Sequence, residues 1–120
     1  MKMAHVSIFS KWMDESVAFY QDIVGLTVLR DMRDNPLHPI VFLANAAGET
    51  CVEIIGEPDN AFQGSGISMG FVTDDAEAKR AELEEKGYHP GPMISPGPGT
   101  KFFFIQDPNG VGVQFIQEDR

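Results

Sequence analysis

The chain carries the same order of elements twice, with a period of about 60 residues. The first half is predicted to form a strand at 4–9, a helix ending at 23–26 and strands near 27–31, 40–43 and 50–55. The second half repeats this order with a strand at 67–73, a helix from 74 to 86, a short edge strand within 89–99 and strands at 101–106 and 111–117. Residues 56–66 between them have linker composition. We therefore predict one α+β domain, residues 1–120, built of two β-α-β-β-β modules at 1–57 and 64–118.

The helix of the second half has signals at both ends. Asp74 with Glu77 three residues later resembles a capping box, in which the two side chains bind free backbone N–H groups. Gly87 follows Lys86 and suits the left-handed position that ends many helices. These signals predict a helix that begins near 74 and ends at 86.

Composition excludes several classes of partner. The net charge is −9, from 18 acidic and 9 basic residues, so phosphate backbones and anionic lipids would be repelled. No apolar run is long enough to span a bilayer, and no signal peptide precedes the first predicted strand. Cys51 is the only cysteine and forms no intrachain disulfide. We expect a cytoplasmic protein that binds neither nucleic acid nor membranes.

Strand alternation places two polar residues on one face of the first module. His5 lies opposite Val6 and Ile8 on its strand, and Glu53 lies opposite its own apolar neighbours, Val52 and Ile54. A carboxylate among apolar strand residues is costly to bury unless it is paired or bound to a metal. The pair is therefore either a structural contact between His5 and Glu53 or part of a metal site.

Several strings of the sequence resemble one superfamily. They are His5-Val6, Phe19-Tyr20 through Gly25-Leu26, Val52-Glu53-Ile54, Gly70-Phe71 through Asp75, Leu83 through Gly87, and Phe104-Ile105-Gln106-Asp107-Pro108-Asn109-Gly110. The chain resembles the vicinal oxygen chelate superfamily, which includes glyoxalase I, extradiol dioxygenases and bleomycin-resistance proteins. The resemblance implies an open, cupped, eight-stranded mixed sheet with helices on its convex face and the ligand in the concave cup. It also implies a homodimer, with the cup completed within one chain or across two.

The resemblance further implies four candidate ligand positions, on the first and last strand of each half. They fall on His5, Glu53, Ser68 and Gln114. Serine is a poor ligand for divalent metals and an amide is weaker than a carboxylate, so half of a metal site is present. Glutamine also cannot act as a general base, the role that the last carboxylate has in glyoxalase I. If a metal binds, we expect one zinc, nickel or manganese ion held by His5, Glu53 and Gln114, with Glu53 as the catalytic candidate.

Three further residues are candidates for the ligand cup. Cys51 shares the face of Glu53, although a packing role is the simpler interpretation. Trp12 precedes the first helix and could stack on a planar ligand or only cover the helix start. Of the consecutive residues Phe102 to Phe104, at least one must point into the cup, and Phe102 is the candidate.

Three functions remain open from the sequence. The first is a binding protein for a small cationic or planar compound, as in bleomycin-resistance proteins. The second is a metal-dependent lyase or isomerase resembling glyoxalase I, for which the glutamine on the last strand is unfavourable. The third is an accessory domain without a functional cup, which no residue favours. We expect the first.

Overall fold

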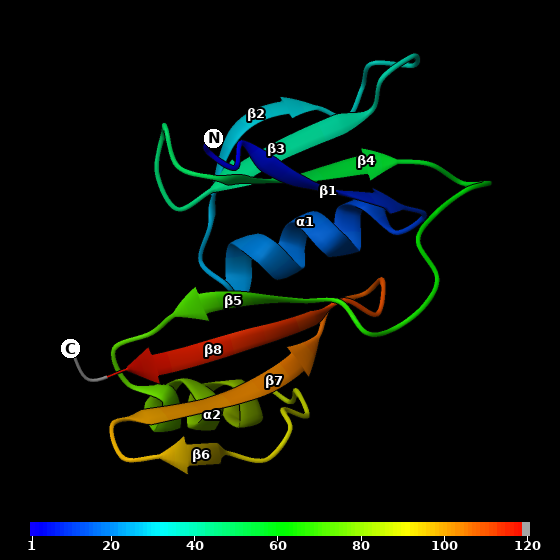
Figure 1. Ribbon diagram of the computed structural model, residues 1–120. Helices are drawn as coiled ribbons and strands as arrows, with labels where there is room; N and C mark the ends of the chain where they lie inside the picture. The colour runs from blue at the N-terminus through cyan, green and yellow to red at the C-terminus, as the bar shows by residue number, and fades with distance from the viewer. Residues whose placement is uncertain (119–120) are drawn as a thin grey trace. The chain divides into compact units, whose positions relative to one another are not determined.

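The computed structural model describes residues 1–118, which form two compact units, Met1–Gln63 and Gly64 onward. The first unit contains β1 (His5–Ser10), α1 (Met13–Asp22), β2 (Thr27–Met32), β3 (Ile40–Ala44) and β4 (Cys51–Gly56) (Figure 1). The second contains β5 (Ser68–Val72), α2 (Ala76–Glu85), β6 (Ile94–Gly97), β7 (Thr100–Gln106) and β8 (Gly112–Glu118). We call these units the first and second module. The predicted repeat of β-α-β-β-β is confirmed. Most boundaries differ from the prediction by one or two residues, and α1 ends at Asp22 instead of within 23–26.

The two modules have the same sheet topology. The strand order is β1-β4-β3-β2 in the first sheet and β5-β8-β7-β6 in the second. In each, the first and last strands pair in parallel and the other neighbours pair antiparallel. The α+β class and the mixed, open sheets are therefore confirmed. The joining of the two sheets into one cup stays a prediction.

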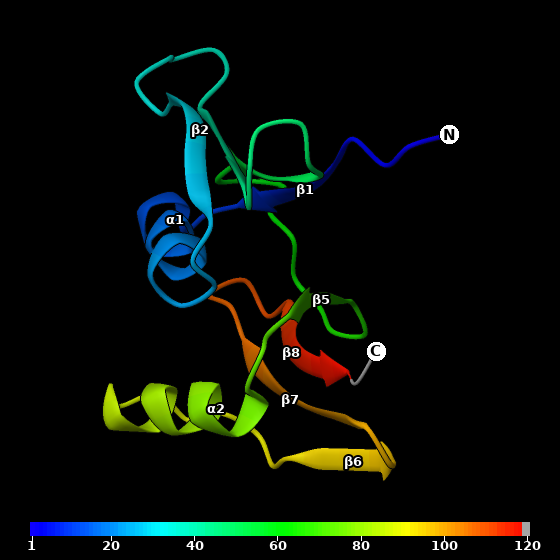
Figure 2. The ribbon, with the colours of Figure 1, turned by 90° about the vertical axis from the view of Figure 1, so that its left-hand side faces the viewer.

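In each module the helix packs on one face of its own sheet (Figure 2). Val41, Leu43 and Ile54 of the first sheet are fully buried, as are Tyr20 and Val17 of α1, which contacts β3 and β4. The second module has a similar core of Phe103, Val113, Phe115 and Leu83. Neither helix has the length or the apolar run needed to cross a bilayer within residues 1–118.

The capping box predicted for α2 is wrong by one residue. The N-cap is Asp75 instead of Asp74, and its carboxylate accepts a 3.0 Å hydrogen bond from the backbone N–H of Ala78. Both aspartates suit this position, and the choice depends on contacts distant in sequence. The side chain of Gln117 on β8 accepts the N–H of Ala76 at 2.9 Å, which sets where the first turn begins. The helix ends at Glu85 with Lys86 as its C-cap, one residue before the predicted end. Gly87 follows in the predicted left-handed conformation, with φ +90°.

Candidate functional site

The side chains of interest lie on the open face of each sheet, by which we mean the face turned away from the helix of the same module. In the first module, strand register aligns four residues in a row across the open face. Ser7 pairs with Glu53, Glu53 with Phe42, and Phe42 with Arg30. The row therefore places a carboxylate, an aromatic ring and a guanidinium on three adjacent strands.

Glu53 and His5 meet on this face, as alternation predicts. Oε1 of Glu53 accepts a 2.9 Å hydrogen bond from the Ser7 hydroxyl, and Oε2 lies 3.2 Å from Nδ1 of His5. The residue Glu53 is only 8% exposed, whereas the side chain of His5 is 48% exposed. The two partners offset the cost of burying the carboxylate, and the imidazole remains accessible to a ligand.

An apolar row lies beside this polar group. Phe9 pairs with Ile55, Ile55 with Ile40, and Ile40 with Met32. Phe9, near the end of β1, is 47% exposed. The open face thus offers an apolar platform next to a polar group, which is the usual composition of a small-molecule site.

Cys51 lies beside His5, because these two residues are register partners. The thiol is partly buried, with Sγ 3.8 Å from the carbonyl oxygen of Glu49. The predicted sharing of one face by Cys51 and Glu53 therefore agrees with the structure.

The second module has an equivalent but different open face. Ser68 pairs with Gly112 as His5 pairs with Cys51, and Gln114 occupies the place of Glu53. The counterpart of Ser7 is Gly70, and a Cβ built there would lie 2.8 Å from Oε1 of Gln114. The amide of Gln114 therefore lies over Gly70, in the space that corresponds to the side chain of Ser7 in the first module.

The three consecutive phenylalanines divide between the two faces of their sheet. Phe102 and Phe104 are on the open face, with ring centroids 5.7 Å apart. Phe103 points to the helix side and is fully buried. Phe102 therefore lies on the open face, and its place in a ligand cup stays a prediction.

Trp12 is far from His5 on the first module. It is the N-cap residue of α1, two residues after the end of β1, while His5 begins that strand. At about 3.3 Å per strand residue, the two are roughly 20 Å apart. Nζ of Lys11 lies 5.5 Å from the Trp12 ring centroid. Trp12 is 46% exposed, and both of its proposed roles stay predictions.

The donor atoms on the open faces do not fit a metal centre well. Among residues 1–118 no group of three or more histidine, cysteine, aspartate or glutamate side chains is arranged to hold a metal ion. The equivalent positions supply one imidazole and one carboxylate in the first module, and one hydroxyl and one amide in the second. Hydroxyl and amide oxygens are weak ligands for zinc or nickel, so we assign no step to a metal.

Three residues of the row that contains Glu53 were not among the predicted site residues. Ser7 could have been found, because it shares the alternation of His5. Phe42 and Arg30 could not, because their alignment with Glu53 depends on strand register.

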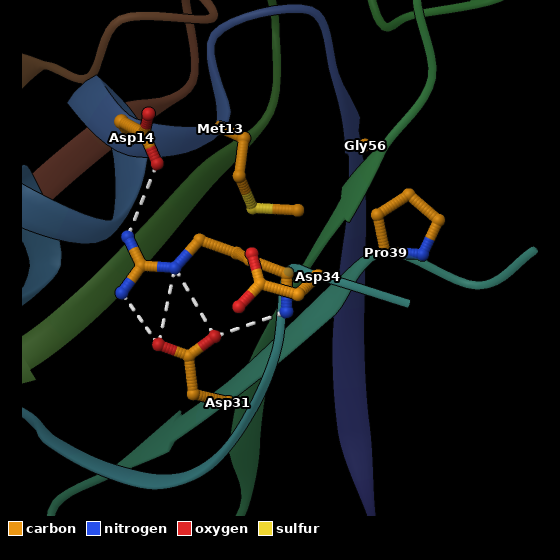
Figure 3. Close-up of a pocket in the computed structure, with 7 residues that line it drawn as sticks. Met13, Asp14, Asp31, Asp34, Pro39 and Gly56 are labelled. Carbon is orange, nitrogen blue, oxygen red and sulfur yellow. Dashed lines mark hydrogen bonds and ion pairs between the residues drawn. The ribbon is translucent and has the colours of Figure 1, made fainter. Parts of the chain in front are cut away.

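A separate cavity of about 570 Å³ lies where α1 begins (Figure 3). Its lining residues are Met13, Asp14, Asp31, Arg33, Asp34, Pro39 and Gly56. Arg33 donates two hydrogen bonds from Nε to the Asp31 carboxylate, both 3.1 Å long, and one from Nη1 to Asp14 at 3.2 Å. Gly56 lies two residues after Ile54 on β4, and Asp31 is the register partner of Val41, so both are on the helix side of the sheet. The cavity is therefore on the face opposite the open face. We interpret Arg33 as a structural link between the start of α1 and the end of β2.

Replacing Arg33 with methionine should destabilise the protein at neutral pH but not at strongly acidic pH. Hydrogen bonds from the Arg33 side chain and backbone lower the pKa of Asp31 below its usual 3.8. A lowered folded-state pKa contributes stability above the usual value, and the contribution is lost as the pH falls through the lowered value. Because Asp31 is exposed, we expect a small loss at pH 7 that disappears toward pH 2. Urea unfolding of both proteins between pH 2 and 7 measures this, and an equal difference at every pH would contradict it.

Comparison with known proteins agrees with this architecture. The profile of the Glyoxalase/Bleomycin resistance protein/Dioxygenase superfamily matches residues 2–115. The chain belongs to this superfamily. It is 28% identical to lactoylglutathione lyase of Haemophilus influenzae, across 98% of this chain and 93% of that protein.

Solved structures of other proteins show the same fold. A glyoxalase family protein from Bacillus anthracis superposes with a TM-score of 0.78 at 17% identity, covering 99% of this chain and 96% of that one. The antibiotic-binding protein TnmS3 from Streptomyces sp. CB03234 superposes with a TM-score of 0.73 at 23% identity, covering 99% and 97%.

The strings that resemble the glyoxalase superfamily most closely have structural roles in this chain. Phe19 and Tyr20 are buried in edge-to-face contact, with ring centroids 5.1 Å apart. Asp107 is buried, and its carboxylate accepts the backbone N–H groups of Asn109 and Val111. These motifs therefore identify the glyoxalase scaffold but say little about its ligand.

Proposed function

We propose that the chain binds a small organic molecule on the open faces of its sheets, with the first module supplying the main contacts. The observation that supports this most directly is the joining of Glu53 to Ser7 and His5 beside an apolar row that includes exposed Phe9. Such a face combines orienting polar groups with apolar area. In this proposal Ser68, Phe102 and Gln114 complete the cup from the second module. Catalysis is not required for this function.

A metal-dependent lyase or isomerase is the second candidate. It is favoured by the 28% identity to a lactoylglutathione lyase over nearly the whole chain. His5, Glu53 and Gln114 would hold a zinc, nickel or manganese ion, which would act as a Lewis acid on the substrate. The donor set is the reason we place this candidate second, because an amide replaces the last carboxylate.

Metal analysis of protein purified without a histidine tag separates the two candidates. For a binding protein we expect far less than one metal per chain, and no rise in melting temperature when zinc, nickel or manganese is added. A bound ligand should instead stabilise the fold, by about 2.7 kcal/mol at a hundred times its Kd. Stoichiometric metal that is lost in Glu53→Ala would overturn the binding proposal in favour of the lyase.

We also propose that the protein forms a homodimer, as the resemblance implies. Light scattering coupled to size-exclusion chromatography should give twice the 13.2 kDa mass of the chain. A mass of one chain at micromolar concentration would contradict the dimer without affecting the binding proposal.

A further inference from the structure

Among the lysine and arginine side chains of the first module, Arg30 differs from the others because it has no partner within residues 1–118. Lys2 donates to the carbonyl oxygen of Gly48, Lys11 lies over the Trp12 ring, and Arg33 binds Asp31 and Asp14. Among the residues that the structure describes, Arg30 has neither an ion pair nor a side-chain hydrogen bond, and it is exposed.

The position of Arg30 places its charge on the open face of the first module. Arg30, Phe42 and Glu53 are register partners on the adjacent strands β2, β3 and β4 of the open face. Adjacent strands lie about 4.8 Å apart, so roughly 10 Å separates the backbones at Arg30 and Glu53. The partly buried ring of Phe42 lies between them. One end of this row is cationic and the other is acidic.

The two ends select different chemical groups. A guanidinium without a partner presents a planar set of donors suited to a carboxylate. At the other end, the Glu53 carboxylate and the accessible His5 ring can accept a hydrogen bond from a ligand. The charge of −9 disfavours anions in general, so an acidic ligand needs a local cation such as Arg30.

We propose that the open face of the first module binds a planar aromatic acid that carries a hydroxyl group at its far end. The carboxylate contacts Arg30, the ring lies against Phe42, and the hydroxyl donates to Glu53 or His5. This inference rests on the proposed function, because it names the ligand class for the same face.

Three related compounds test each end of the row by isothermal titration calorimetry. The probe 4-hydroxyphenylacetate has both groups, its methyl ester lacks the charge, and phenylacetate lacks the hydroxyl. An ion pair with an exposed arginine is worth up to about 1 kcal/mol, so the ester should bind up to about fivefold more weakly than the acid. The difference should shrink at high salt, because Arg30 is exposed.

Variants assign each loss to a residue. Arg30→Gln should weaken binding of 4-hydroxyphenylacetate to the level of the ester and leave binding of the ester unchanged. Glu53→Gln should reduce the preference for 4-hydroxyphenylacetate over phenylacetate. Arg33→Gln is the matched control, because it removes an equal charge from the other face of the sheet and should leave all three affinities unchanged. A folding defect would instead weaken every probe equally.

The outcomes separate this inference from the proposed function. Equal binding of all three probes, unaffected by Arg30→Gln, overturns the inference but supports small-molecule binding. Binding of none of them also overturns the inference, and a thermal-shift screen of unrelated planar compounds then decides the proposed function by itself.

Discussion

Phe103→Ala is expected to destabilise the second module by about 3–5 kcal/mol. The Phe103 side chain is fully buried on the helix side of its sheet, with its ring centroid 5.4 Å from that of Phe115. Truncation removes this apolar contact area and leaves a cavity that the surrounding strands cannot fill. A loss of this size is a large part of the stability of a domain this small.

The adjacent Phe102 is the matched control, because it has the same side chain on the opposite face. Phe102→Ala should cost about 1 kcal/mol, since the open face leaves that ring partly exposed. Urea unfolding followed by circular dichroism measures both losses. Equal losses would contradict the assignment of the two faces.

The same experiment tests whether the two modules unfold together. Trp12, the only tryptophan, lies in the first module, so its fluorescence reports the unfolding of that module. If the chain is one domain, as the sequence predicts, fluorescence and circular dichroism should lose their signals at the same urea concentration in Phe103→Ala. An unchanged fluorescence transition would show that the first module is stable by itself.

Asp107→Ala is expected to cost about 2–4 kcal/mol. One carboxylate oxygen of Asp107 accepts the N–H groups of Asn109 at 2.7 Å and Val111 at 3.0 Å, and the residue is 5% exposed. Alanine would leave these backbone donors without their partner in the turn between β7 and β8. Gly110, with φ +92°, completes the turn in a conformation that favours glycine.

Asp107→Asn separates the hydrogen bonds from the charge. Asparagine keeps a carbonyl oxygen in the same place, so we expect less than half of the loss caused by alanine. Thermal and urea unfolding at pH 7 compare the three proteins. A loss in the asparagine variant as large as that in the alanine variant would show that the charge is what stabilises the turn.

Much of the site could be predicted because alternation is a local property. A strand with period two forces His5 and Ser7 to one face, and Glu53 must oppose Val52 and Ile54. The repeat also matched Ser68 with His5 and Gln114 with Glu53, and the strand registers of the two modules agree with this match.

Other parts could not be predicted because they depend on distant contacts. Asp74 and Asp75 are equally good N-cap residues by themselves, and a side chain on β8 helps to decide between them. The ion pairs of Arg33 join the end of β2 to a helix nineteen residues earlier. The position of Trp12, at the opposite end of β1 from His5, likewise follows from the fold, and its role in a cup stays a prediction.

The sequence by itself determined the order of elements, their faces and the mismatch between the two halves, because all three follow from local periodicity and residue identity. Only the tertiary structure decided which residues meet across the sheet. The contact of His5 and Ser7 with Glu53 spans about 46 residues and requires parallel pairing of β1 and β4. The row from Glu53 through Phe42 to Arg30 likewise requires the register of three strands. Register is set by packing of the whole sheet against its helix, and no local segment of the chain contains that information.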